Sequence, residues 1–429
     1  MAKLLKLPCG LSVCYERRRG TGSCALGIYV AAGSRDEDDD SNGVAHFIEH
    51  MLWKGTERRT AADIADEFDA LGANSNAYTS KSNTCFYAFG LAKYLPKYMD
   101  IFSDMLFYST FTEENIEKER GVVLEEIKMY DDEGDSVCED LLAAKYYGKS
   151  KLARPILGTE ETVKSLTAEK IRRFMAKYYV PQNIALSYAG PATEEEILAL
   201  AETYFGKEFS SRTYAPAERK KEKVRTKRFF ATRFDKPFEQ ANVIIRFPAY
   251  PVESAKENAA AVAAGIIGGG MSSRLFQKVR EESGLVYEIY ASETAVKGTG
   301  YVTIAYACMP ECAKEAMLKV REVLEEAKKN GFTQEEFDKI KASRETNVVL
   351  GEEAAYTVMR LMGKSFCMLG KPTTFRASLK KLEKITLTDV TEAFRCIFDY
   401  DKAAVAYVGK KTDVDLLAVL KHGGDYGKN

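Results

Sequence analysis

The apolar residues of this chain follow two patterns. Short runs that are apolar throughout or at alternate positions predict β-strands, and they lie at residues 24–32, 84–89, 185–189, 241–247, 301–306 and 403–407. Longer blocks with one apolar and one polar face predict helices, and the clearest cover residues 92–108, 310–330 and 352–369. Strands and helices do not alternate strictly, so the pattern predicts an α+β fold in which helices cover a sheet.

The two halves of the chain are similar to each other. The string that begins at Phe111 recurs from Phe332, and in each copy a threonine suited to a helix N-cap precedes acidic residues. Upstream, Gly72 and Gly284 each precede a strand-like run and then a helical segment. This internal repeat predicts two related domains, each a mainly antiparallel sheet covered by helices.

A change in composition at residues 210–228 predicts the boundary between these domains. The segment passes from serine and proline into a basic run that also contains glutamates. A nucleic-acid patch is the alternative, but the glutamates and the absence of aromatic residues from the basic run favour a solvated linker. The predicted domains are therefore residues 1–209 and 229–429.

Composition and charge narrow the class of protein. The 429 residues are 45% hydrophobic and 29% charged, and 62 basic against 63 acidic residues leave a net charge of −1. This balance is typical of a soluble globular protein and gives no overall field for nucleic acid or anionic membrane. The nine cysteines are odd in number and scattered, which favours reduced thiols in the cytoplasm over a disulfide framework.

The N-terminal segment and the most apolar stretch do not change this expectation. Residues 1–10 lack the apolar core and cleavage site of a signal peptide. Residues 259–270 are glycine-rich and shorter than the roughly 20 apolar residues that span a bilayer. We therefore predict a soluble, cytoplasmic protein that binds neither nucleic acid nor membrane.

Histidine is scarce in this chain, and the positions of the histidines indicate a metal-binding motif. Two of the three histidines, His46 and His50, form the pattern H-x-x-E-H with Glu49 between them. On a helix the two imidazoles lie one turn apart on one face, where they can hold one metal ion. The pattern is the inverted form of the H-E-x-x-H zinc signature, in which a carboxylate takes a proton from water activated by zinc. The alternative is a chance match, which the concentration of the histidines disfavours.

A catalytic zinc ion needs a third protein ligand. The helical segment at residues 112–130 supplies carboxylates, and Glu119 and Glu126 lie seven residues apart, about 20° from alignment on one face. Both border the apolar stripe, whereas Glu125 points away from it. Helical geometry therefore favours Glu119 or Glu126 without choosing between them, and the alternative is a set of surface charges.

These motifs together resemble the pitrilysin family of zinc metallopeptidases, which includes insulin-degrading enzyme and mitochondrial processing peptidase. The resemblance rests on the HFIEH segment, on Glu126 at 126 − 50 = 76 residues beyond the second histidine, and on the string from Glu119 to Ile127. It implies that His46, His50 and Glu126 bind Zn²⁺. It further implies that Glu49 is the general base and that Glu119 supports catalysis near the metal.

The same resemblance assigns residues that bind substrate. Asn76 and Ala77 stand in a segment similar to the family's N-A-x-T edge strand, which pairs with the substrate backbone; a polar turn before a strand is the alternative. Arg280 and Tyr287 have the spacing of the pair that the family's inactive half contributes. In that role the tyrosine bonds to the developing oxyanion, and the arginine holds the substrate.

The resemblance predicts a zinc endopeptidase that cuts peptides or unfolded segments inside an enclosed chamber. The family builds that chamber from four such domains, so a chain with two implies a homodimer, with Arg280 and Tyr287 completing the site of the opposite subunit. No cofactor beyond Zn²⁺ is expected, because the glycine run at 268–270 lacks the G-K-[ST] of a nucleotide-binding loop. A non-catalytic scaffold subunit of the same fold and a purely structural zinc site are the alternatives.

Overall fold

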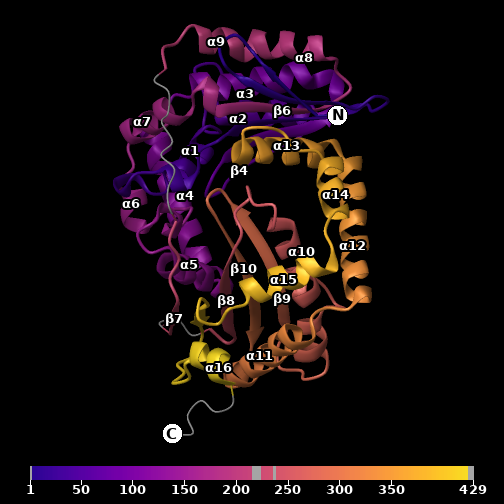
Figure 1. Cartoon of the computed structure of the whole chain (residues 1–429). Helices are drawn as coiled ribbons and strands as arrows, with labels where there is room; N and C mark the ends of the chain where they lie inside the picture. Colours follow the sequence, from indigo (N-terminus) through magenta and orange to yellow (C-terminus); the bar gives the residue numbers. More distant parts are fainter. Residues whose placement is uncertain (1, 215–223, 235–237, 424–429) are drawn as a thin grey trace. The chain divides into compact units, whose positions relative to one another are not determined.

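The computed structural model describes residues 2–214, 224–234 and 238–423 (Figure 1). The chain forms two compact units that are interleaved in sequence. The first unit comprises Met1–Ile127, Arg154–Lys220 and Asn347–Ser378, and the second comprises Lys128–Ala153, Lys221–Thr346 and Leu379–Asn429. Each unit thus includes a segment from the other half of the chain.

The first unit is built on a six-stranded sheet with the order β1-β2-β6-β3-β5-β4. Its strands are β1 Lys3–Lys6, β2 Ser12–Arg17, β3 Ser23–Val30, β4 Asn74–Thr79, β5 Thr84–Leu91 and β6 Ile184–Gly190. Strands β2 and β6 are parallel, and the other neighbours are antiparallel. Strand β4 is therefore an edge strand.

Both faces of this sheet are buried. On β3, Leu26 and Ile28 belong to the core beneath helices α1 Val44–Met51 and α3 Leu95–Tyr108. The alternate residues Ala25 and Tyr29 belong to a second cluster, formed with helix α13 Ala355–Leu369. The packing of α13 is close, because a Cβ added at Gly363 would lie 2.1 Å from the Tyr29 ring. A sheet covered on both faces explains why β3 reads as continuously apolar.

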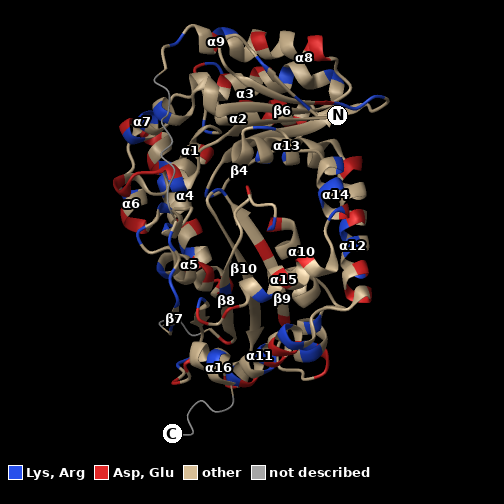
Figure 2. Cartoon of the chain, viewed as in Figure 1, with Lys and Arg blue, Asp and Glu red and all other residues tan. Residues whose placement is uncertain are grey.

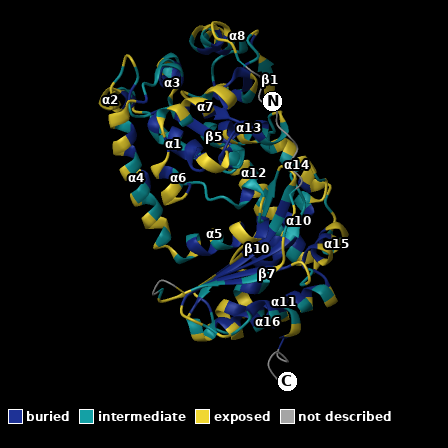
Figure 3. Ribbon diagram, turned by 90° about the vertical axis from the view of Figure 1, so that its left-hand side faces the viewer, coloured by how far each residue is buried: buried dark blue, intermediate teal, exposed yellow. Residues whose placement is uncertain are grey.

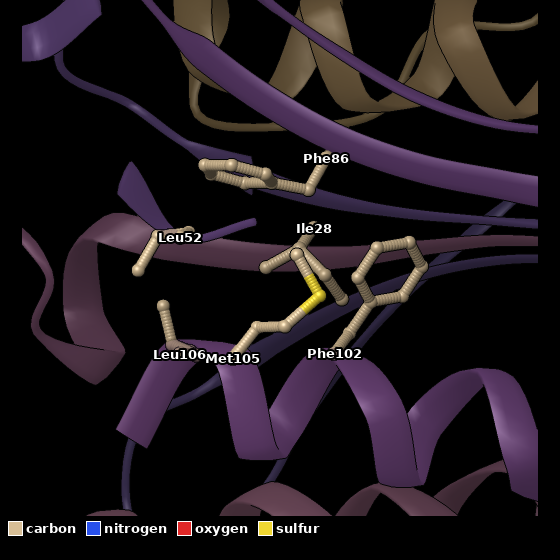
Figure 4. Close-up of a pocket in the computed structure, with 6 residues that line it drawn as sticks. All are labelled: Ile28, Leu52, Phe86, Phe102, Met105 and Leu106. Carbon is tan, nitrogen blue, oxygen red and sulfur yellow. The ribbon is translucent and has the colours of Figure 1, made fainter. Parts of the chain in front are cut away.

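A small apolar cavity lies in the core of the first unit (Figure 4). Its wall is formed by side chains of β3, β5 and α3, together with the residue that follows α1: Ile28, Leu52, Phe86, Phe102, Met105 and Leu106. No polar side chain is among these six, so the cavity offers a ligand no hydrogen-bonding partner and belongs to the packing of the core.

The second unit has a five-stranded sheet with the order β7-β11-β8-β10-β9. Its strands are β7 Phe229–Arg233, β8 Ala241–Ala249, β9 Glu288–Val296, β10 Thr299–Cys308 and β11 Ala404–Val408. Strands β7 and β11 are parallel, and the remaining pairs are antiparallel. Without β1, the first sheet has the same order of strand directions, which is the structural counterpart of the repeat in the sequence.

Helices cover both faces of the second sheet as well. The core on one face contains residues of α10 Glu257–Gly268, α11 Ala313–Asn330, α15 Leu387–Ile397 and α16 Leu416–His422. The other face packs against α5 Gly134–Tyr147, where the buried Arg246 bonds to Glu139 at 2.7 Å and lies over the Tyr301 ring. Figure 3 shows strand β10 as buried, whereas many residues of α4 Glu113–Asp131, a helix mainly of the first unit, are exposed.

The predicted fold class is confirmed: the protein is α+β, with two mostly antiparallel sheets and helices. The predicted helix at 352–369 begins later, at Ala355, because α12 Gln334–Glu353 ends just before it. Residues 215–223 of the predicted linker lie outside the described part of the chain, and the boundaries 1–209 and 229–429 stay a prediction.

Charge and hydropathy of the described helices agree with the composition. Acidic and basic residues are interspersed along α12 (Figure 2), as expected for a chain with almost no net charge. Within the described residues, we find no helix that combines the length and the apolar character needed to cross a bilayer.

Candidate metal centre

The H-x-x-E-H motif lies on the short helix α1. The helix starts after Gly43, whose φ of 93° is in the left-handed region that glycine adopts without strain. His46 and His50 point from the same side of the helix, and their Nε2 atoms are 3.3 Å apart. His46 is buried and His50 is half-buried, so the two imidazoles converge on one partly enclosed point.

Glu126 on α4 completes a group of three possible metal ligands. Its Oε2 atom lies 3.7 Å from His46 Nε2 and 3.5 Å from His50 Nε2, and the three residues form a metal-ligand cluster. An ion with roughly tetrahedral bonds of about 2.0–2.1 Å holds its ligand atoms about 3.3 Å apart. Glu126 Oε2 is also buried without a hydrogen-bond partner. The two nitrogens and one oxygen therefore fit a zinc ion in both type and spacing.

Glu119 lies behind His50 rather than beside the three ligand atoms. His50 Nδ1 is 2.7 Å from Glu119 Oε1, and Lys54 Nζ is 2.7 Å from Glu119 Oε2. Burial acts to raise the pKa of Glu119, but the bonds to His50 and Lys54 outweigh it and hold the pKa below its usual value. A carboxylate that accepts from Nδ1–H leaves Nε2 free to bind metal. The structure thus separates the two carboxylates that helical geometry alone left equivalent.

The imidazoles differ in their electrostatics. Burial, with the neighbouring His50, lowers the pKa of His46 to about 3, so this ring is neutral as a metal ligand must be. For His50, burial acts to lower the pKa, but the bond to Glu119 and the charges of Glu126 and Glu49 raise it. Three carboxylates around His50 favour a positive charge at this place, which a bound metal cation would supply.

Glu49 lies on the same helix and is tied to the edge strand. Thr79, the last residue of β4, donates a hydrogen bond from Oγ1 to Glu49 Oε2 at 2.6 Å. Burial raises the pKa of Glu49, whereas the bond from Thr79 and the nearby His50 act in the opposite direction. A carboxyl group whose pKa is raised holds a proton more readily, which suits it to accept a proton and return it.

The predicted substrate-binding residues Asn76 and Ala77 lie on β4. They pair with Tyr87 and Phe86 of β5, and the Ala77 N–H donates to Asn76 Oδ1 at 2.7 Å. The opposite side of β4 is the edge of the sheet. Their position is that of a strand able to accept an extended peptide, and their role in binding stays a prediction.

Arg280 and Tyr287 belong to the second unit. Arg280 lies on the π-helical turn Phe276–Glu281, is exposed, and has its guanidinium 4.6 Å from the centre of the Phe276 ring. The Tyr287 side chain is also exposed, and its backbone N–H donates to the Ala307 carbonyl at 2.9 Å. Both side chains are accessible, and their contribution to a catalytic site stays a prediction.

The structure also brings in residues to which the sequence assigned no role. Lys54 bonds to Glu119, Thr79 bonds to Glu49, and Glu37 contacts the first turn of α1. Lys54 stands four residues after His50, but α1 ends at Met51, so helical periodicity does not account for its position. Thr79 ends the N-A-x-T string, whereas no periodic signal singles out Glu37.

Comparisons with known proteins agree with this geometry. Residues 12–160 match the family Insulinase (Peptidase family M16), and residues 165–344 match the Peptidase M16 inactive domain. The uncharacterized zinc protease YmxG of Bacillus subtilis is 35% identical over 394 residues, which are 92% of this chain and 95% of that protein. An uncharacterized zinc protease of Streptomyces coelicolor is 34% identical, over 97% of this chain and 89% of its own.

Solved structures show the same fold. A protease from Helicobacter pylori superimposes with a TM-score of 0.88 at 19% identity, covering 95% of this chain and 99% of its own. The structure of a peptidase M16 inactive domain from Pseudomonas fluorescens superimposes with a TM-score of 0.87 at 20% identity, covering 96% of this chain and 98% of its own. At these identities the likeness concerns the fold, and it extends over nearly the whole chain.

Proposed function

Because the chain belongs to the insulinase or pitrilysin family, peptidase family M16, we propose that it is a zinc-dependent endopeptidase. The observation that carries this proposal is the convergence of His46 Nε2, His50 Nε2 and Glu126 Oε2, with the carboxylate of Glu49 on the same helix. A scaffold subunit of this fold would have no need of a general base beside a complete set of metal ligands.

His46, His50 and Glu126 are the residues that would hold the metal. When bound, zinc supplies a Lewis acid that polarises the scissile carbonyl and lowers the pKa of water. Glu49 then takes the proton of the attacking water at Oε1, because Oε2 already accepts the Thr79 hydroxyl. The same carboxyl group can return this proton to the leaving amine.

The remaining residues act on the substrate or on the ligands. Glu119 holds His50 in the tautomer that binds metal. An extended peptide would add to the edge of β4 at Asn76 and Ala77, which selects unfolded segments over folded ones. Arg280 and Tyr287 would hold the substrate and the oxyanion in an enclosed chamber formed by a homodimer.

The nine cysteines support a cytoplasmic location. None of them forms a disulfide in the described chain, and most are buried, as expected for a protein kept in a reducing compartment. The family's substrates are peptides, so the proposed partners are peptides and a second copy of the chain.

The test combines metal analysis with hydrolysis of an unstructured, fluorescence-quenched peptide, with and without a chelator. We expect bound zinc, cleavage by the wild type, and loss of cleavage on chelation. Glu49→Gln should keep the metal and lose turnover, because it removes the base and no ligand. Zinc bound by a wild type that cleaves none of a varied set of peptides would instead favour the scaffold or structural-zinc alternatives.

A separate experiment tests sharing of the site between subunits. Glu49→Gln and Tyr287→Phe subunits, each inactive alone, should together recover about one working site per mixed dimer. Absence of recovery in a verified mixed dimer would count against sharing.

A further inference from the structure

A buried carboxylate contacts the first turn of the helix that carries the zinc motif. Glu37 Oε2 accepts hydrogen bonds from the Gly43 N–H at 2.9 Å and the Asn42 side-chain amide at 2.7 Å. Its Oε1 accepts from the Ala45 N–H at 2.9 Å. The side chain has no exposed surface. Burial raises the pKa of Glu37 to about 7, although these bonds favour the charged form.

This contact replaces a cap that α1 lacks. The first backbone N–H groups of a helix need partners outside the helix, and they favour a negative charge. The residue in the N-cap position is Gly43, which has no side chain to supply one. Other helices of the same unit are capped by their own threonine, as α2 Ala61–Ala70 is by Thr60 and α8 Glu194–Ala201 is by Thr193. Helix α1 takes its cap from a carboxylate six residues upstream.

The loop that presents Glu37 is held against another part of the unit. Arg154 donates to the Glu37 carbonyl at 2.7 Å, and the Asn42 side chain donates to the Pro155 carbonyl at 3.0 Å. The backbones also approach closely, because a Cβ on Gly43 would lie 2.5 Å from the Leu157 carbonyl oxygen. The carboxylate is therefore a fixed point and not a mobile side chain.

The position of α1 decides the metal geometry. The helix has only eight residues, and Ala45, which bonds to Glu37, directly precedes His46. A shift of the first turn would move both histidines relative to Glu126, which is supplied by another helix. Metal and catalytic groups work within about 0.5 Å of their productive geometry. The anchoring of this one turn thus bears on the whole ligand set.

We propose that Glu37 is a positioning residue: its buried carboxylate fixes the first turn of α1 and so sets His46 and His50 against Glu126. The inference rests on the proposed zinc site, since it concerns the affinity of that site. It differs from an ordinary helix cap, which would contribute to stability and leave metal binding unchanged.

Glu37→Gln tests the proposal in the full-length protein. The glutamine amide places an NH₂ group against one of the N–H donors, so one bond becomes a repulsive contact. We expect the zinc dissociation constant to rise about 10-fold or more, as for other residues that support a metal ligand from behind. The visible spectrum of the Co²⁺-substituted protein should change, and kcat should fall more than KM rises.

Thr193→Ala is the matched control, because it removes the cap of a helix in the same unit that carries no metal ligand. It should lower the melting temperature and leave zinc affinity and the Co²⁺ spectrum as in the wild type. If Glu37→Gln only lowers the melting temperature as the control does, the proposal is wrong.

A milder variant covers the case in which Glu37→Gln does not fold. Asn42→Ala removes the side-chain amide that donates to Glu37 and should weaken zinc binding by a smaller factor in the same direction. Unchanged zinc binding would overturn the inference. Failure of the proposed function gives a different result. A wild type that binds zinc without cleaving peptides overturns the endopeptidase and leaves the affinity comparison intact.

Discussion

The bond between Glu119 and His50 allows a quantitative test of how the site holds its metal. Glu119 is 2% exposed and lies 2.7 Å from both His50 Nδ1 and Lys54 Nζ. In Glu119→Gln the side-chain oxygen can accept from one of these donors, and the NH₂ group then faces the other. The histidine loses the charged partner that fixes its tautomer and raises its basicity.

We expect the zinc dissociation constant of Glu119→Gln to rise by about 10- to 100-fold, the usual effect of removing such a partner. This corresponds to about 1.4–2.8 kcal/mol of binding free energy. The loss of zinc-binding free energy should be smaller than that caused by substituting a metal ligand itself, because Nε2 of His50 and Oε2 of Glu126 keep their positions. Competition with a fluorescent chelator at fixed pH and ionic strength measures the change.

Glu125→Gln is the control for charge. It removes one carboxylate from the same helix, adjacent to Glu126, but the residue is exposed and its effect should be within a factor of two. An unchanged zinc affinity in Glu119→Gln would refute the argument that this carboxylate orients His50. Equal weakening in both variants would show that general electrostatics, and not the hydrogen bond, governs affinity.

Two further predictions follow from hydrogen bonding and burial. Thr79→Val removes the hydrogen-bond donor to Glu49, and a bond to a charged group is worth about 1.5–3 kcal/mol, so kcat should fall at least 10-fold with zinc affinity unchanged. Thr79→Ser keeps the donor and should keep kcat. An equal loss of kcat in both variants would contradict this role of Thr79. A second prediction concerns Glu293, whose pKa is raised to about 8 by burial and by the nearby Glu257. The folded state therefore binds this proton more tightly than the unfolded state does. As a result, the free energy of unfolding should fall as pH rises from about 4.5 to 8. Glu293→Gln should remove about 4 kcal/mol of this pH-dependent loss of unfolding free energy, measured by urea unfolding at pH 5 and 8.5. A variant whose unfolding free energy falls with pH as steeply as that of the wild type would contradict this.

Local sequence patterns were sufficient to predict much of the fold and the placement of two candidate metal ligands on one helix face. Apolar runs predicted the central strands, since both faces of each sheet are covered and the runs are continuous. The spacing of His46 and His50 predicted one face of a helix because helical geometry is local. Glu126 needed the family resemblance, because its distance from the histidines depends on how α4 packs against α1.

The supporting contacts could not be predicted in the same way. Glu37 reaches α1 through a loop whose course is set by contacts with Arg154 and Pro155, more than a hundred residues away in sequence. Thr79 meets Glu49 because the edge strand ends beside α1, which is a property of the sheet. Such contacts join elements far apart in the chain, and no periodicity in the sequence records them.

The interleaving of the two units has a consequence for the metal site. Strand β3 lies between two layers, with Leu26 and Ile28 in the core below α1 and with Tyr29 against α13. The Ser187 hydroxyl on β6 also donates to the Met359 carbonyl of α13 at 2.7 Å. Without α13 the sheet would expose one apolar face to water, at a cost of about 25 cal/mol per Å². The sheet on which α1 and β4 rest therefore depends on a helix from the second half of the chain, and the half that carries the zinc motif is not sufficient to build its own support.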